Sequence, residues 1–317
     1  MSQHEPLETI TDPLGIGASG PVSGPVRKSS EFRTRAISAA VLATGVVILA
    51  YIGGLPFRIL AVATGVIILQ EWSSMTGCLR PFDVAQRFTV GAMLAVGLLV
   101  LFAQYWLAIV ATIVCFLGAY AISYVKLRQK PRPPEARHWS WLSLGFLYAS
   151  SIMVSFAVLR GDSAFGLAAC AFVLAVVWAT DTFAYLVGKN VGGPKLAPRV
   201  SPNKTWSGFI GGIVFAVLSG LAVAYGYKAS GQLPNVSWML VPIAIVLSVV
   251  SQFGDLFESW VKRRSGAKDS GRIIPGHGGL MDRIDGLGAA AVAALLMIVL
   301  STRGTDMSDT LFLLLES

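Results

Sequence analysis

Charged residues are scarce in this chain of 317 residues: they make up 13% of it, whereas hydrophobic residues make up 54%. The mean hydropathy is correspondingly high, at +0.66. A soluble domain of this composition would have to bury nearly every helix on all sides, which a single core of this size cannot do. The scarcity of charge therefore excludes an ordinary soluble domain and indicates an integral membrane protein.

Cysteine is also scarce, and the three that occur, Cys78, Cys115 and Cys170, fall singly within apolar runs. No spacing among them predicts a disulfide framework or a zinc site. We interpret them as small packing residues. A Walker loop is absent as well, because G-x-x-x-x-G-K-[ST] does not occur in the chain.

Long apolar runs are plentiful, and several approach the roughly 20 residues that a helix needs to cross a bilayer. We predict an all-α polytopic membrane protein with about nine transmembrane helices. The expected spans are about 36–54, 57–78, 88–103, 105–125, 141–159, 163–187, 207–227, 237–261 and 286–302.

The N-terminal region differs from the rest. Residues 1–30 are rich in Pro, Gly, Ser and acidic residues and have no apolar run, which predicts a disordered tail. They also lack the basic start and apolar centre of a signal peptide. Residues 31–140 are expected to form the N-terminal helices with a basic loop, residues 141–303 a second transmembrane region, and residues 304–317 a short tail.

Basic residues predict the topology. With the N-terminus in the cytoplasm and nine crossings, the C-terminus lies on the opposite side, and all but four of the 25 Lys and Arg fall in cytoplasmic segments. The four exceptions are Arg58, Arg160, Lys228 and Arg303. The basic residues lie in separate short loops, which argues against nucleic-acid binding and favours attraction to anionic lipid headgroups.

A first polar region follows the sixth predicted helix. Asp181 lies within an apolar run, where a carboxylate is costly enough to indicate a function. The loop beyond it supplies lysines and hydroxyl groups, and glycines then open the seventh helix, an arrangement that suits a phosphate. The alternative is a topological loop with glycines for close helix packing. The polar residues are Thr182, Tyr185, Lys195, Ser201, Asn203, Lys204 and Thr205, and the glycines are Gly208, Gly211 and Gly212.

A second polar region begins in the eighth predicted helix. Gln252, Asp255, Ser259 and Lys262 recur at a spacing that places them along one helix face. Phe253, Phe257 and Trp260 occupy the other faces, where lipid or helices can pack. For Glu258, an ordinary ion pair with Lys262 is the favoured interpretation.

The loop after this helix concentrates charge in GAKDSGRIIPGHGGLMDRIDG, residues 266–286. Asp282 and Asp285 are three residues apart and, with Asp255, form a set of hard oxygen ligands. Magnesium takes a few carboxylates together with phosphate oxygens and water, and Lys and Arg neutralise the remaining phosphate charge. The alternatives are a salt-bridged loop in which both aspartates cap the last helix, a structural ion pair for Arg283, and a hydrogen-bonding role for His277 in place of a general base.

This segment resembles the signature of the phosphatidate cytidylyltransferases, also called CDP-diacylglycerol synthases. The pattern is S-x-[apolar]-K-R, four residues, then K-D-x-[small]-x-x-[apolar]-[P/G]-x-H-G-G-[apolar]-x-D-R-[apolar]-D, and it fits from Ser259 to Asp285 without departure. The upstream D-T-x-A-Y-x-x-G-K at 181–189 and S-P-x-K-T at 201–205 are similar to the same family. One position departs: Ser207 stands where a Glu is expected.

The resemblance implies that residues 141–303 form the catalytic region. The implied reaction joins CTP and phosphatidic acid into CDP-diacylglycerol and pyrophosphate, with Mg²⁺, by attack of the lipid phosphate on the α-phosphorus of CTP. Asp255 and Asp282 would hold the metal with Asp285 as a third ligand, and a second metal ion is left open. Lys268 is expected among the catalytic residues with these three aspartates. The expected substrate-binding residues are Asp181, Lys195, Ser201, Lys204, Thr205, Ser259, Lys262, Arg263, His277 and Arg283.

The resemblance also implies a homodimer in the bacterial cytoplasmic (inner) membrane. The topology predicted from the basic residues places both polar regions on the cytoplasmic side, so the active site is expected to face the cytoplasm. Two other functions stay open at this stage. A transporter could place Asp181 and Asp255 in helices, although its charged residues should then gather near the bilayer midplane. Another CTP-dependent lipid transferase or kinase would share the nucleotide-handling residues and act on a different acceptor.

Overall fold

The structure is a computed structural model of the chain and describes residues 43–78, 84–129, 135–162, 165–233, 235–271, 273 and 278–301. Eight of its helices are long and apolar enough to cross a membrane. They are α2 (Gly54–Met75), α3 (Val84–Leu101), α4 (Tyr105–Arg128), α5 (Glu135–Arg160), α6 (Gly166–Val191), α7 (Trp206–Ala229), α8 (Leu240–Arg264) and α9 (Met281–Ser301). A shorter apolar helix, Ala43–Ile52, precedes α2.

The prediction of an all-α polytopic membrane protein is therefore confirmed. Of the first predicted span, 36–54, residues 36–42 lie outside the described residues, as do the predicted tails 1–30 and 304–317. The chain also forms a two-stranded hairpin, β1 (Lys195–Ala197) and β2 (Ser201–Thr205), where the sequence predicts only a loop. The side of the membrane on which each terminus lies stays a prediction.

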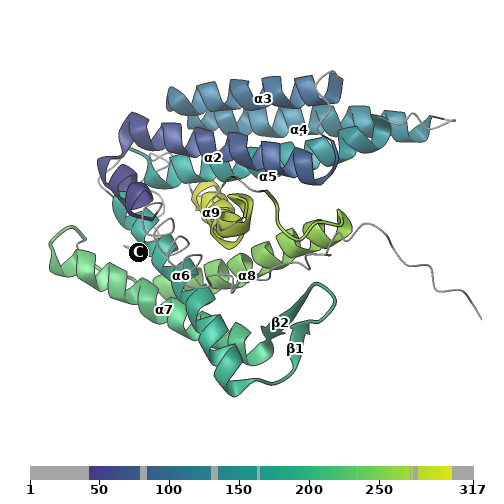
Figure 1. Cartoon of the computed structure of the whole chain (residues 1–317). Coiled ribbons are helices and arrows are strands. Elements are labelled where there is room, and N and C mark those ends of the chain that lie inside the picture. The colour runs from purple at the N-terminus through teal and green to yellow at the C-terminus, as the bar shows by residue number, and fades with distance from the viewer. Residues whose placement is uncertain are drawn as a thin grey trace, which may run out of the picture.

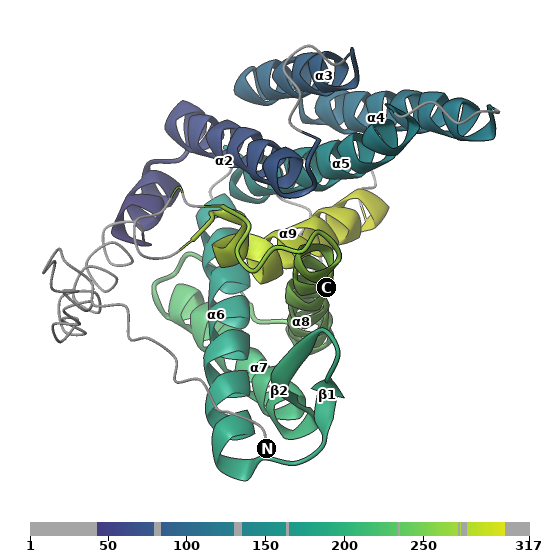
Figure 2. The ribbon, with the colours of Figure 1, turned by 45° about the vertical axis from the view of Figure 1, so that its right-hand side comes forward.

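The helices form two groups with α9 between them. In Figure 1, α2, α3, α4 and α5 lie as one layer, with α3 and α4 outermost, and the hairpin lies on the far side of the molecule. The turned view of Figure 2 keeps α9 between this layer and α8. Helix α5 is central to the first group, since 72% of its span is buried.

Aromatic packing joins the two groups. Trp72 of α2 is 1% exposed, and its ring lies 6.1 Å from that of Trp141, 5.6 Å from that of Tyr148 and 6.3 Å from that of Phe257 in α8. Its Nε1 donates to the Trp141 carbonyl at 2.8 Å. In a bilayer such van der Waals contacts and hydrogen bonds replace the hydrophobic effect as the force that joins helices.

Helices α6 and α7 pack with their backbones close together. A β-carbon on Gly208 would lie 2.5 Å from the Ala184 carbonyl oxygen, and one on Gly212 would lie 3.0 Å from that of Thr180. Small residues permit this approach in membrane helices. These glycines therefore allow the close helix packing that the sequence analysis gave as an alternative, whichever other role Gly208 has.

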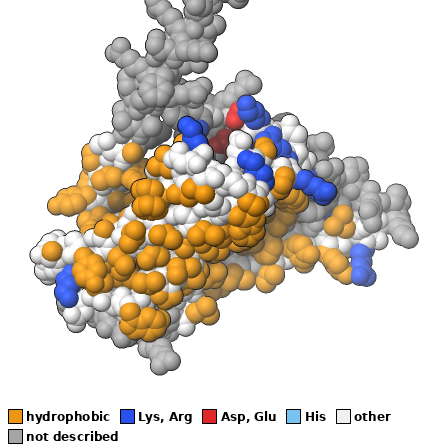
Figure 3. All heavy atoms as spheres, turned by 90° about the horizontal axis from the view of Figure 1, so that it is seen from below, with side chains coloured by type: hydrophobic (Ala, Val, Ile, Leu, Met, Phe, Trp, Pro, Cys, Tyr) orange, Lys and Arg blue, Asp and Glu red, His pale blue; other side chains and the backbone are white. Residues whose placement is uncertain are grey.

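The outer surface is apolar, as a lipid environment requires. Figure 3 shows hydrophobic side chains across the middle of one face, with Lys and Arg toward its margins. On α7 the exposed side chains of Trp206, Ile210, Val214 and Leu218 recur every four residues and form a stripe. We call these four residues the α7 apolar stripe, and it begins beside the hairpin.

Candidate active site

The polar end of α6 leads directly into the hairpin. Gly192 ends α6 with a φ of 69°, in the left-handed region that favours glycine. The strands then pair antiparallel, with Lys195 opposite Thr205 and Ala197 opposite Ser201. This pairing folds the polar loop predicted from the sequence back over the start of α7.

Thr205 both ends β2 and caps α7. Its Oγ1 accepts a hydrogen bond from the Gly208 amide at 3.2 Å, which satisfies one of the free amides of the first helical turn. Ser207 lies in the same turn: its Oγ donates to the Gly192 carbonyl and lies 3.1 Å from the Thr205 Oγ1. The serine that departs from the family pattern therefore ties the end of α6 to the start of α7.

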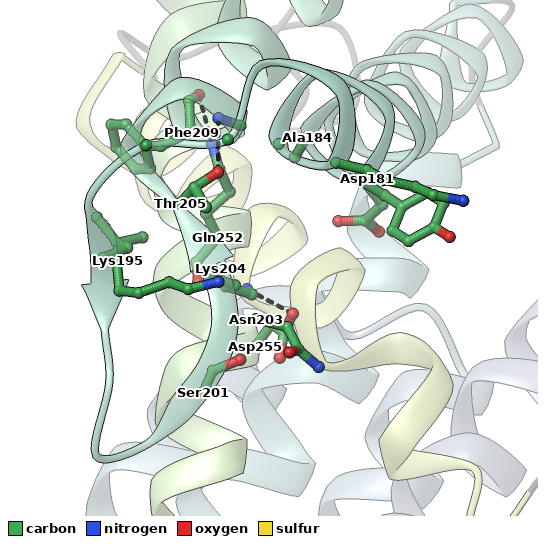
Figure 4. Close-up of a pocket in the computed structure, with 17 residues that line it drawn as sticks. Asp181, Ala184, Lys195, Ser201, Asn203, Lys204, Thr205, Phe209, Gln252 and Asp255 are labelled. Carbon is green, nitrogen blue, oxygen red and sulfur yellow. Dashed lines mark hydrogen bonds and ion pairs between the residues drawn. The ribbon is translucent and has the colours of Figure 1, made fainter.

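A cavity of about 720 Å³ lies between the hairpin, α6, α7 and α8. Six of the substrate-binding and metal-binding residues predicted from the sequence line it: Asp181, Lys195, Ser201, Lys204, Thr205 and Asp255. Figure 4 shows that they come from separate elements, with Asp181 on the α6 side and Asp255 beside the hairpin residues Lys204 and Ser201. Asn203 and Gln252 also line the cavity.

Lys204 and Asp255 form the closest charged pair of this cavity. The Lys204 Nζ lies 2.5 Å from the Asp255 Oδ2 and 3.5 Å from the Gln252 carbonyl oxygen (Figure 4). Ser259 donates to the other oxygen, Oδ1, at 3.3 Å. The side chains of Lys204 and Asp255 are 25% and 34% exposed, so both charges are accessible from the cavity.

Asp282 lies near the start of α9 and is bonded on both oxygens. Its Oδ1 accepts from the Lys262 Nζ at 2.7 Å, and its Oδ2 accepts from the amides of Ser270 at 2.9 Å and Gly279 at 3.0 Å. The Lys262 Nζ also lies 3.5 Å from the Glu258 Oε2, so the predicted pair within α8 is present. Asp282 therefore joins the end of α8, the following loop and the start of α9.

The predicted metal ligands do not share one set of contacts. Asp285 accepts at Oδ1 from the Gly286 amide at 2.8 Å, and only Asp255 of the three aspartates is among the residues lining the cavity. Among the described residues, no three His, Cys, Asp or Glu side chains are grouped so as to hold a metal ion. The joint ligand role of Asp255, Asp282 and Asp285 thus stays a prediction.

Three more of the predicted site residues lie outside this cavity. Arg263, Lys268 and Arg283 are exposed, and none of them lines the cavity. His277 lies outside the described residues. Their roles toward substrate stay predictions.

The sequence interpretation missed Glu71. This α2 residue is 2% exposed, and it accepts hydrogen bonds from the amides of Leu280 and Met281 at 2.9 and 2.8 Å and from the Ser270 hydroxyl at 3.1 Å. The signal was available, because Glu71 is a carboxylate within an apolar span, as Asp181 is. What it contacts could not be read from the sequence, since its partners lie about 200 residues away.

Comparison with known proteins identifies the family of the chain. A family model described as the cytidylyltransferase family matches residues 33–301. The chain is 42% identical over 262 residues to the phosphatidate cytidylyltransferase of Brucella abortus, which covers 83% of this chain and 91% of the relative. It is 33% identical over 267 residues to that of Bacillus subtilis, covering 80% and 93% of the two chains.

A phosphatidate cytidylyltransferase of Staphylococcus aureus is 33% identical over 236 residues, with 74% of this chain and 86% of the relative covered. The family model extends over the N-terminal helices as well as the two polar regions, and together with these relatives it confirms the resemblance carried by the signature segment. The chain therefore belongs to the cytidylyltransferase family and is a nucleotidyltransferase.

Proposed function

We propose that this protein transfers CMP from CTP to phosphatidic acid, giving CDP-diacylglycerol and pyrophosphate. The observation that carries the proposal is the cavity in which Asp255 and Lys204 meet beside Lys195 and the hydroxyls of Ser201 and Thr205. A cavity with both signs of charge and several hydroxyls suits a nucleotide phosphate chain. The bacterial relatives that bear the name phosphatidate cytidylyltransferase support the lipid acceptor.

The donor set of Asp255 fits a magnesium ion. Magnesium is usually bound by one or two carboxylates together with substrate phosphate oxygens and water. Asp255 is a hard oxygen ligand on the cavity, and within the described part of the chain each of its oxygens has one partner, which leaves lone pairs for a metal ion. Asp282 is the second ligand that we propose, through Oδ1, whose hydrogen bond within the described residues comes from Lys262. When bound, the ion would neutralise charge on the phosphate oxygens.

The protein's own residues would position and neutralise the substrates. In the reaction, an oxygen of the lipid phosphate forms a bond to the α-phosphorus of CTP, and the bond to the β-phosphate oxygen breaks. The nucleophile is already anionic, so the chain needs little base catalysis and contributes orientation and charge. We assign phosphate binding to Lys204 and Lys195, with the hydroxyl of Ser201 and the amides at the start of α7 beside them.

The lipid would reach the cavity from the side. The α7 apolar stripe begins at Trp206, directly after the cavity-lining Thr205, and Tyr185 of the cavity is 64% exposed. Trp and Tyr are enriched where a membrane meets water. Acyl chains lying along the stripe would therefore place a headgroup at the cavity. We propose that this end of the protein faces the cytoplasm of a bacterial inner membrane, where CTP is available, and that the enzyme is a homodimer.

The activity can be tested directly. The full-length protein is purified in detergent and incubated with radiolabelled CTP, phosphatidic acid and Mg²⁺, and the lipid fraction is separated by chromatography. We expect a labelled CDP-lipid and an equal amount of pyrophosphate. Parallel reactions with a polyprenol or with diacylglycerol test other acceptors. A product that forms with one of these and not with phosphatidic acid would overturn the assignment, as would the absence of product when the Brucella enzyme is active in the same assay. Light scattering of the same preparation tests the dimer.

A further inference from the structure

Glu71 connects the first helical group to the loop that precedes α9. Its Oε1 accepts from the Leu280 amide at 2.9 Å, and its Oε2 accepts from the Met281 amide at 2.8 Å and from the Ser270 hydroxyl at 3.1 Å. The carboxylate is almost fully buried, and Ser270 is 4% exposed. One side chain of α2 thus holds two separate parts of the α8–α9 connection.

Asp282 completes this arrangement from within α9. Its Oδ2 accepts from the amides of Gly279 and Ser270, so the three successive amides 279–281 all donate to the two carboxylates. The first amides of a helix have no partner within the helix, and a negative charge beside them is favoured by the helix dipole. We call Glu71 and Asp282, with the segments 270–271 and 279–281 that they bind, the carboxylate clamp.

Two glycines of the loop leave room for the Glu71 carboxylate. A β-carbon on Gly271 would lie 2.6 Å from the Glu71 Oε1, and one on Gly279 would lie 2.7 Å from the Glu71 Oε2. The absence of side chains at these positions lets the carboxylate reach the backbone. The same two glycines lie in the segment that resembles the family signature, so part of that segment is complementary to a residue about 200 positions upstream.

We propose that Glu71 is a positioning residue for the nucleotidyl transfer: by holding the start of α9 and Ser270 in place, it fixes Asp282 opposite Lys262. Glu71 does not line the cavity and would not touch substrate. It would act through Asp282, whose Oδ1 contacts Lys262 at 2.7 Å. This inference rests on the proposed function only in that Asp282 acts in the reaction. The position of the loop itself can be measured separately.

The test uses Glu71→Gln and Glu71→Asp in the full-length protein, with Ser73→Ala as a matched control. Ser73 is buried in α2 close to Glu71, and the hydrogen bond described for its hydroxyl goes to the Leu69 carbonyl of its own helix. Three quantities are measured: CDP-lipid turnover, hydrogen–deuterium exchange of peptides covering 268–286 and of peptides from α6 and α7, and the thermal unfolding midpoint.

Glu71→Gln keeps the shape but replaces one acceptor oxygen with an NH₂ group, which then faces a backbone N–H. We expect turnover to fall by about tenfold to a hundredfold, with a smaller change in the CTP concentration for half-saturation. Exchange should become at least about tenfold faster in 268–286 and stay unchanged in α6 and α7. Glu71→Asp keeps the charge and should recover part of both losses, while Ser73→Ala should behave as wild type.

Wild-type turnover together with wild-type exchange in Glu71→Gln would overturn the proposal. Exchange that rises equally in all helices would also overturn it, because Glu71 would then support the fold in general. If Glu71→Gln does not accumulate in the membrane, Ser270→Ala takes its place, because it removes a single hydrogen bond to Glu71. Unchanged exchange and turnover in Ser270→Ala would count against the clamp, and faster exchange confined to 268–286 would support it. An inactive wild-type protein would refute the proposed function, whereas the exchange data would still test the position of the loop.

Discussion

Replacement of Asp255 by Asn tests whether its charge serves catalysis or only a structural ion pair with Lys204. Asn has nearly the same shape, and its carbonyl oxygen can still accept the hydrogen bond from Ser259. The pair with Lys204 is short, at 2.5 Å, but the two side chains are 25% and 34% exposed. A pair so accessible to solvent contributes within about 1 kcal/mol to stability. The unfolding midpoint of Asp255→Asn should therefore lie close to that of the wild type.

Turnover should respond very differently. Asp255 is the one predicted metal ligand that lines the described cavity, where a fixed charge acts on the reacting phosphates. Loss of one such electrostatic contact typically costs about a hundredfold to a thousandfold in rate. We therefore expect Asp255→Asn to lose at least about a hundredfold in CDP-lipid formation. Turnover with radiolabelled CTP and unfolding followed by tryptophan fluorescence, in the same detergent, measure the two effects side by side.

A double variant tests the alternative that Asp255 merely neutralises Lys204. If neutralising Lys204 were the only role of Asp255, and Lys204 did not itself bind phosphate, Lys204→Met combined with Asp255→Asn would restore activity, because no unpaired lysine would remain. We expect no recovery. The matched control is Asp162→Asn. Asp162 lies in the connection between α5 and α6, at the end of α6 away from the hairpin, and contacts Arg58 at 3.9 Å. This variant loses that contact and should keep its activity. Recovery in the double variant, or at least a third of wild-type turnover in the single one, would refute the reasoning.

Three further predictions concern the loop and the topology. Asp282→Asn should abolish turnover while membrane insertion persists, because it removes the charge opposite Lys262; near-normal activity would remove Asp282 from the site. Gly279→Ala should lower turnover at least about tenfold, since its β-carbon would meet the Ser270 hydroxyl and the Glu71 carboxylate, whereas Gly118→Ala, with open space around it, should not; equal activities would contradict the clamp. A cysteine at Arg199, in a background without the natural cysteines, should react with an impermeant maleimide in inside-out vesicles and not in intact cells, and the reverse pattern would invert the proposed orientation.

Hydropathy was sufficient to predict the eight described helices that are long and apolar enough to cross a membrane. The short third segment was predicted at 88–103, and it forms a helix of its own, Val84–Leu101. The starts of α5 and α9 differ most from the prediction: α5 begins at Glu135 where 141 was expected, and α9 begins at Met281 where 286 was expected. Charged residues at these starts lower the hydropathy of the segment. They do not prevent helix formation, because the helical backbone hydrogen bonds form with charged and apolar side chains alike.

The hairpin could not be predicted in the same way. β1 and β2 are three and five residues long, and neither KLA nor SPNKT has the alternation that indicates a strand. The pairing between them and the cap that Thr205 gives α7 keep the hairpin in place. The residue types in this loop were nevertheless sufficient to predict a polar site, because Lys195, Ser201, Lys204 and Thr205 all line the cavity.

Glu71 and Asp282 show why residue type alone does not define a role in this protein. Both are carboxylates near the ends of apolar spans, and both bind the amides at the start of α9. Both oxygens of Glu71 are occupied by backbone amides and Ser270, and it does not line the cavity, so its charge can only hold the loop. Asp282 uses one oxygen for the loop and turns the other toward Lys262. In the arrangement that we propose, Glu71 holds the loop while Asp282 faces the end of α8, and α2, far from the signature segment in the sequence, thereby contributes to the architecture of the site.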